Sequence, residues 1–130
     1  MNQTIRGGCF CGACRYETGA EPINVRACHC RACQKVTGGP FYARVLVPAD
    51  TLSISGPVHW FASSPDVRRG FCPHCGSSLF SERSSINAIG LTMGTLDEPE
   101  RYQPTDHIWV SCKQPWIVLP DGPPQHQEGL

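Results

Sequence analysis

The sequence lacks an excess of charge of either sign, because 11 lysines and arginines face 11 aspartates and glutamates. Proteins that bind nucleic acid usually carry a basic face, so this balance argues against such a partner. A run of about 18 apolar residues, which a membrane-spanning helix needs, is also missing, and we expect no membrane partner. The opening Met1–Gly8 is short and polar, without the apolar stretch of a secretory leader.

Cysteine is the most informative residue type in the chain. There are nine cysteines, and an odd number cannot form a complete set of intramolecular disulfides. Together with the missing leader, this count favours thiolate–metal sites in a reducing compartment. We therefore predict a cytoplasmic metalloprotein.

The 13 glycines and 12 prolines predict frequent turns and few long helices. Only Cys30–Thr37 has helical character, and Gly38-Gly39 follows it as a stop. Short apolar or alternating segments predict strands at Phe41–Val47, Thr51–Ser55, Val58–Ala62, Val67–Phe71, Ser78–Glu82, Ile86–Thr92, Asp106–Ser111 and Trp116–Leu119. We expect one mainly β domain over residues 1–119 and a flexible tail over residues 120–130.

The segment Cys72-Pro-His-Cys75-Gly has the spacing of half a zinc site. Proline sets the turn, and the following glycine accepts a positive φ, so that both sulfurs can converge on one ion. The other half comes from the N-terminal cysteines, where two pairings are equally favoured by spacing. Cys9 with Cys11 would present both sulfurs on one face of an extended segment, and Cys11 with Cys14 would form a second C-x-x-C turn.

Either pairing leaves Cys28, Cys30 and Cys33 as a separate triad with no obvious fourth sulfur beside it. Three protein ligands and an open position are typical of catalytic zinc. The alternative is that Cys112, a spare Cys14 or a histidine closes the site and makes it structural.

Four segments, in order, resemble the glutathione-dependent formaldehyde-activating enzyme family, which includes centromere protein V-like proteins. The segments are GGCFCGACRY, CHCRACQKVTGGPFYARV, RRGFCPHCGSSLF and DHIWVSCKQPW. The resemblance spans roughly Gly7 to Trp116. It implies a β-tent fold of small antiparallel sheets stapled by zinc, with one short helix.

The resemblance also implies two Zn2+ sites. Structural zinc falls on Cys9, Cys11, Cys72 and Cys75, and an active-site zinc, with partial occupancy, falls on Cys28, Cys30 and Cys33. Cys14 and Cys112 depart from the family's pattern, and either thiol could reach a metal. The implied reaction is that of a carbon–sulfur lyase, which forms or cleaves S-(hydroxymethyl)glutathione. The alternative hypothesis is a non-catalytic zinc module that binds a small thiol or a protein partner.

Three other side chains are candidates for the active site. His107 aligns with a histidine common in the family and could carry a proton, although a structural role at the end of a strand is as well supported. Arg69 matches a basic position of the family and suits a glutathione carboxylate. Lys35 lies just past the triad and is a second candidate for a substrate carboxylate, against the simpler interpretation of an exposed helical lysine.

Overall fold

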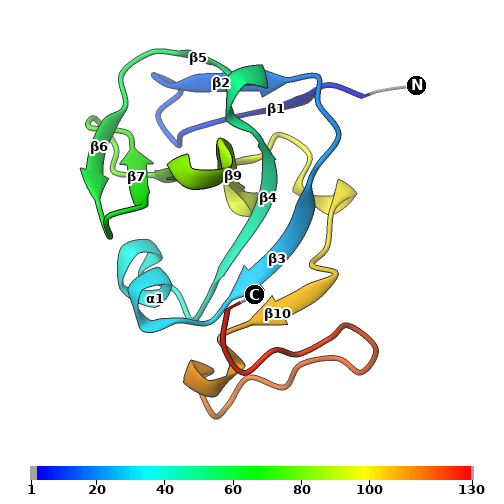
Figure 1. Ribbon diagram of the computed structural model, residues 1–130. Helices are drawn as coiled ribbons and strands as arrows, with labels where there is room; N and C mark the ends of the chain where they lie inside the picture. The colour runs from blue at the N-terminus through cyan, green and yellow to red at the C-terminus, as the bar shows by residue number, and fades with distance from the viewer. Residues whose placement is uncertain (1–2, 130) are drawn as a thin grey trace.

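A computed structural model describes residues 3–129 of the chain (Figure 1). A small sheet has the strand order β1-β2-β5, and a larger one has the order β10-β3-β4-β9-β8-β7-β6. The strands are β1 (Ile5–Gly8), β2 (Arg15–Thr18), β3 (Asn24–Cys28), β4 (Tyr42–Pro48), β5 (Ser53–Ser55), β6 (His59–Ala62), β7 (Val67–Phe71), β8 (Ser78–Arg83), β9 (Ala88–Thr92) and β10 (Asp106–Ile108). A single α-helix, α1 (Arg31–Thr37), lies beside them, so the predicted mainly β fold is confirmed for the described residues.

Neighbouring strands in both sheets run antiparallel except β10 and β3, which are parallel. The strand predicted at Phe41–Val47 is confirmed as β4, which pairs with β3 on one side and β9 on the other. Val45 and Val47 of this strand are fully buried, in agreement with its largely apolar sequence. The strand β7 has the bounds that we predicted.

Other segments differ from the predictions. No strand was predicted before Phe41, where the structure has β1, β2 and β3. The predicted strand at Trp116–Leu119 was wrong, since this segment forms no strand. The strand predicted to continue to Ser111 ends at Ile108, because Trp109 takes a left-handed backbone conformation with φ 56°.

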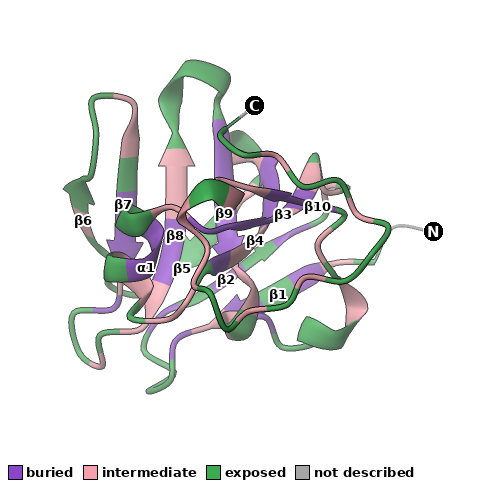
Figure 2. Cartoon of the chain, turned by 90° about the horizontal axis from the view of Figure 1, so that it is seen from below, coloured by how far each residue is buried: buried purple, intermediate pink, exposed green. Residues whose placement is uncertain are grey.

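The main core joins the inner faces of the two sheets, and the buried segments in Figure 2 trace it. Tyr16 of β2 packs edge to face on Phe80 of β8, with ring centroids 5.2 Å apart. Ile5 of β1 is also fully buried here. A second, smaller cluster contains Cys28, Cys33 and Tyr42, with Trp109 packed against it. The two groups of cysteines that we predicted therefore lie in different packing environments.

The helix α1 begins and ends as its sequence predicts. Cys30 is its N-cap, and the Cys30 sulfur accepts a hydrogen bond from the Cys33 amide. Gly38 ends the helix in the left-handed conformation that glycine adopts at low cost, with φ 72°. No helix in the described part of the chain has the length and apolar character that a membrane span requires.

The C-terminal segment folds back beside β10 (Figure 1). The His107 amide donates to the Pro124 carbonyl, and the His126 amide donates to the His107 carbonyl. The His126 ring also lies 3.5 Å from the Asp106 carboxylate. These bonds attach residues 124–128 to the edge of the larger sheet. The flexibility expected for residues 120–130 stays a prediction.

Candidate metal sites and active site

The first group of sulfurs joins two distant parts of the chain. Cys9 and Cys11 lie in the turn after β1, and Cys72 and Cys75 lie in the turn after β7. All four Sγ atoms lie within 4.8 Å of one another, with Cys9–Cys11 at 3.6 Å and Cys11–Cys72 at 3.8 Å. Zinc bonds thiolates at about 2.3 Å, so a tetrahedron of such sulfurs has edges of about 3.8 Å. The residues therefore fit a closed zinc site.

The turn after β7 is built to present its two sulfurs. The His74 amide donates to Cys72 Sγ at 3.4 Å, and the Ser77 hydroxyl lies 3.2 Å from Cys75 Sγ. The contact with Ser77 lowers the pKa of Cys75 to about 5, because a hydrogen bond to sulfur favours the thiolate. Gly76 has φ 80°, the conformation that the sequence predicted for the residue after this turn.

Cys14 does not belong to the four-sulfur group. Its amide donates to Cys9 Sγ at 3.3 Å, and its own side chain is fully buried in the main core. Burial raises the pKa of the Cys14 thiol, and the neighbouring thiols add to this effect. Of the two pairings that spacing left open, the structure gathers Cys9 with Cys11.

The second group combines the end of β3 with the start of α1. Cys28 is the last residue of β3, Cys30 caps the helix and Cys33 lies in its first turn, and their sulfurs lie within 4.8 Å of one another. Contacts with Cys28 and Cys33 lower the pKa of Cys30 to about 2, and the contact with Cys30 raises the pKa of Cys28. The three sulfurs fit three corners of a zinc tetrahedron.

Neither extra thiol completes this second group. Cys14 lies in the main core, and the sulfur of Cys112 lies 3.9 Å from the Ser111 hydroxyl, outside the three-sulfur group. Cys112 is instead tied to the helix through its backbone, since Gln34 Nε2 donates to the Cys112 carbonyl at 3.1 Å. In the described residues the triad thus has three thiols and no fourth.

Arg69 lies directly against the triad. It is only 8% exposed, and its Nη2 donates to Cys33 Sγ at 3.5 Å. Its Nε donates to the Ser63 hydroxyl at 3.0 Å, and its guanidinium lies 5.8 Å from the centre of the Tyr42 ring. Lys35, in contrast, is exposed at the end of α1. The structure therefore brings Arg69, and not Lys35, into contact with a triad sulfur.

His29, which lies between Cys28 and Cys30 in the sequence, contacts a second buried histidine, His107. His29 Nε2 lies 3.2 Å from His107 Nδ1, and both side chains are buried. Burial lowers the pKa of both imidazoles, and each ring is therefore neutral at neutral pH. His29 also contacts the Phe41 ring, with centroids 5.2 Å apart. Sequence reasoning missed the contact between His107 and His29, because 78 positions separate the two residues.

Two further side chains near the triad were not predicted. Gln34 donates to the His29 carbonyl at 2.7 Å as well as to Cys112, and so joins the helix to both neighbouring segments. Tyr42 is buried against the triad cysteines, and its hydroxyl lies 3.0 Å from Ser81. Gln34 could have been suspected from its place one residue after Cys33, but no sequence pattern pointed to Tyr42.

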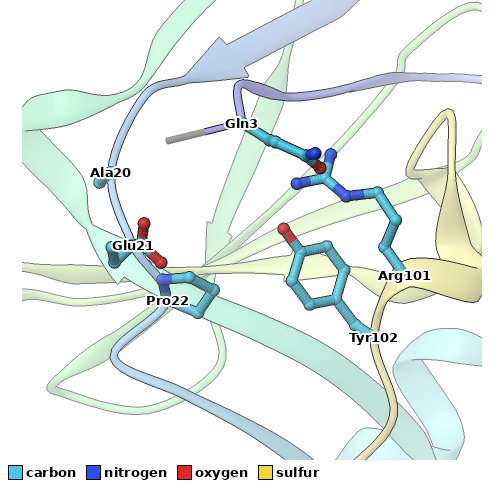
Figure 3. A pocket seen from close by; sticks show the side chains of 6 residues that line it. All are labelled: Gln3, Ala20, Glu21, Pro22, Arg101 and Tyr102. Atoms are coloured by element: carbon cyan, nitrogen blue, oxygen red, sulfur yellow. The ribbon is translucent and has the colours of Figure 1, made fainter. Parts of the chain in front are cut away.

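Two cavities are large enough to hold small molecules. A cavity of ≈370 Å³ is lined by Gln3, Ala20, Glu21, Pro22, Arg101 and Tyr102 (Figure 3). It contains no cysteine or histidine, so its lining offers none of the chemistry considered above. A second cavity, of ≈230 Å³, lies between α1 and the β6–β7 hairpin and is lined in part by Arg69. This second cavity adjoins the triad through that arginine.

Comparison with known sequences agrees with this geometry. The profile of the family described as glutathione-dependent formaldehyde-activating enzyme matches residues 4–112. A protein of Halomonas elongata, provisionally named as an enzyme of that type, is 33% identical over 130 positions, which cover 88% of this chain and 80% of that protein. An uncharacterized lyase of Schizosaccharomyces pombe is 31% identical over 74 positions, covering 57% of this chain and 54% of its own.

A solved structure supports the fold. The crystal structure of a Rhodobacter sphaeroides protein superimposes with a TM-score of 0.59 at 22% sequence identity, over 71% of this chain and 87% of that one. At this identity the likeness concerns the fold alone. The family match, in contrast, covers both groups of cysteines and Arg69. The chain belongs to the glutathione-dependent formaldehyde-activating enzyme family.

Proposed function

We propose that the protein is a zinc-dependent carbon–sulfur lyase that joins a glutathione-type thiol to a small aldehyde, or runs the reverse cleavage. The main support is the Cys28/Cys30/Cys33 group, which offers three sulfurs within 4.8 Å and no fourth thiol in the described residues. The nine unpaired cysteines of the chain suit the reducing cytoplasm, where glutathione is abundant. The other four-sulfur group would hold a structural zinc.

In the proposed reaction the thiol sulfur bonds to the aldehyde carbon, and the proton of the thiol ends on the aldehyde oxygen. A zinc ion held by the triad would keep the added thiol as a thiolate, the form that attacks an aldehyde carbon. The chain's own residues would bind the substrate and move the proton. The Cys28, Cys30 and Cys33 sulfurs would hold the zinc ion at three corners of a tetrahedron, and the substrate thiol would take the fourth.

Arg69 and Lys35 have different parts in this proposal. Arg69, buried beside Cys33, holds a carboxylate of the adduct close to the reacting sulfur. Lys35, exposed at the end of α1, offers a second cation at the rim of the site. His107 is the proton carrier in this proposal, since its Nδ1 lies 3.2 Å from His29 Nε2 and an imidazole can both accept and donate a proton.

The test is calorimetry of glutathione binding to the zinc-loaded protein in two buffers of different ionisation enthalpy. Binding as a thiolate should release one proton, and the apparent enthalpy should therefore depend on the buffer. Cys30→Ser should abolish this dependence. The matched control is Cys112→Ser, which removes a half-exposed thiol outside both sulfur groups and should leave binding unchanged.

Formation of the hydroxymethyl adduct should then exceed the uncatalysed rate in the same buffer, because thiols add to formaldehyde without a catalyst. Glutathione binding without acceleration would make the protein a carrier of small thiols rather than an enzyme. Absence of binding, with zinc confirmed at both sites, would remove glutathione from the proposal.

A further inference from the structure

The cavity between α1 and the β6–β7 hairpin has apolar walls and one cation. Its apolar side chains are Val36 of α1, Phe61 of β6 and Phe71 of β7, and Gly76 and Ser78 also line it. The two phenyl rings lie 6.3 Å apart between centroids. Arg69 is the charged residue of the lining, and it is paired across the hairpin with Phe61.

The charge of Arg69 has no carboxylate partner among residues 3–129. The preceding Arg68 pairs with Glu82, whereas the described contacts of Arg69 are Ser63, Cys33 and the face of Tyr42. A guanidinium has five N–H donors, and these contacts use only two of them. A buried cation with free donors in a cavity wall is suited to an anionic ligand.

The size and walls of the cavity do not match formaldehyde or glutathione. An apolar cavity of about 150 Å³ already holds a benzene molecule. This cavity measures ≈230 Å³ and is therefore much larger than the single carbon of formaldehyde requires. Glutathione carries amides, an ammonium and two carboxylates, which would lose hydrogen bonds to water against Val36, Phe61 and Phe71. The lining matches one carboxylate on an apolar body.

We propose that this cavity binds the aldehyde-derived half of the adduct, and that the electrophile is an aldehyde with a carboxylate on an apolar body. The inference rests on the proposed function, since the thiol half occupies the triad. The carboxylate lies on Arg69, which also donates to Cys33 Sγ at 3.5 Å, so that the cavity and the triad share this arginine. As in the reaction proposed above, the carbon–sulfur bond forms and the proton of the thiol moves to the aldehyde oxygen.

The first experiment uses small probes without an aldehyde. Benzoate, added to the zinc-loaded protein, should shift the amide resonances of β6 and β7, and benzamide, its neutral analogue, should bind at least tenfold more weakly. Arg69→Gln should remove this preference. The matched control is Arg68→Gln, which removes the same charge from the same strand at an exposed position and should leave benzoate binding unchanged.

A second variant keeps the test decisive if Arg69→Gln fails to fold. Phe61 is 40% exposed on the edge strand β6, so Phe61→Ser should fold and should weaken benzoate binding at least fivefold through loss of an apolar wall. Cleavage of the adduct of glutathione and para-formylbenzoate should also proceed with a kcat/KM at least tenfold above that of the benzaldehyde adduct.

The outcomes separate this inference from the proposed function. Equal binding of benzoate and benzamide, or no binding of either, would overturn the carboxylate subsite even if glutathione and formaldehyde still react on the protein. Selective benzoate binding without any thiol binding at the triad would retain the subsite and overturn the lyase proposal. Equal kcat/KM for the two adducts would overturn the assignment of the aldehyde half to this cavity.

Discussion

Cys72→Ser should release the structural zinc and destabilise the fold. Cys72 is fully buried at the end of β7, and its sulfur lies 3.8 Å from that of Cys11, 61 positions away. A covalent link across a loop of that length restricts the unfolded chain by about 4 kcal/mol at 25 °C. A metal link restricts the unfolded chain in the same way, so we expect loss of the zinc to lower the free energy of unfolding by about 2–4 kcal/mol.

For a domain of this size such a loss lowers the melting temperature by roughly 10 °C. The assay is thermal unfolding followed by near-ultraviolet circular dichroism, with zinc per chain measured by mass spectrometry on the same sample. Zinc content should fall by one ion per chain. Cys112→Ser is the control, since its sulfur lies outside both groups, and it should change neither quantity. A melting temperature within about 2 °C of the parent protein, with full zinc content, would refute the assignment of Cys72 as a ligand.

Three further predictions concern groups outside the first sulfur group. Burial lowers the pKa of His29 and of His107, so the native state binds fewer protons than the unfolded chain at acidic pH. The free energy of unfolding should therefore fall as the pH drops below 6.5, by up to about 1.4 kcal/mol per pH unit for each ring. Chemical denaturation at several pH values should show this slope, and His29→Gln should reduce it. Cys14 is fully buried and Cys112 half-buried, so iodoacetamide should modify Cys112 first in the native zinc-loaded protein, as peptide mass spectrometry can verify, and the reverse order would contradict the packing of Cys14. Hydrogen exchange should show protection at the His126 amide if the C-terminal segment stays on β10, and fast exchange there would support the flexible tail.

Local sequence was sufficient for the elements whose structure depends on near neighbours. A helix was predicted at Cys30–Thr37 from its residues and from Gly38-Gly39, and the structure has it at Arg31–Thr37, because capping acts within one turn. The strand β4 was predicted from a largely apolar, β-branched segment, which is typical of a strand with neighbours on both sides. The C-x-x-C turn at Cys72–Cys75 also depends only on local geometry.

The N-terminal strands could not be predicted in this way. β1 and β2 contain two glycines, two arginines and a glutamate, and no alternating apolar pattern. They are stabilised by pairing with each other and by packing on the larger sheet, as Tyr16 does on Phe80. A side chain at Gly7 would collide with the Tyr16 hydroxyl, so this glycine is needed for a close approach that only the folded chain contains.

The sequence by itself determined which residues can bind metal, because thiol chemistry and short spacings are properties of the local chain. Spacing could not choose between Cys9 and Cys14 as the partner of Cys11. The family resemblance favoured Cys9, and the tertiary structure gathers the same sulfurs by placing the Cys14 side chain in the core. The contact of Arg69 with Cys33 likewise joins positions 36 residues apart. Such contacts depend on how the sheets pack, since the pairing of distant strands is governed by burial over the whole fold and not by any local pattern.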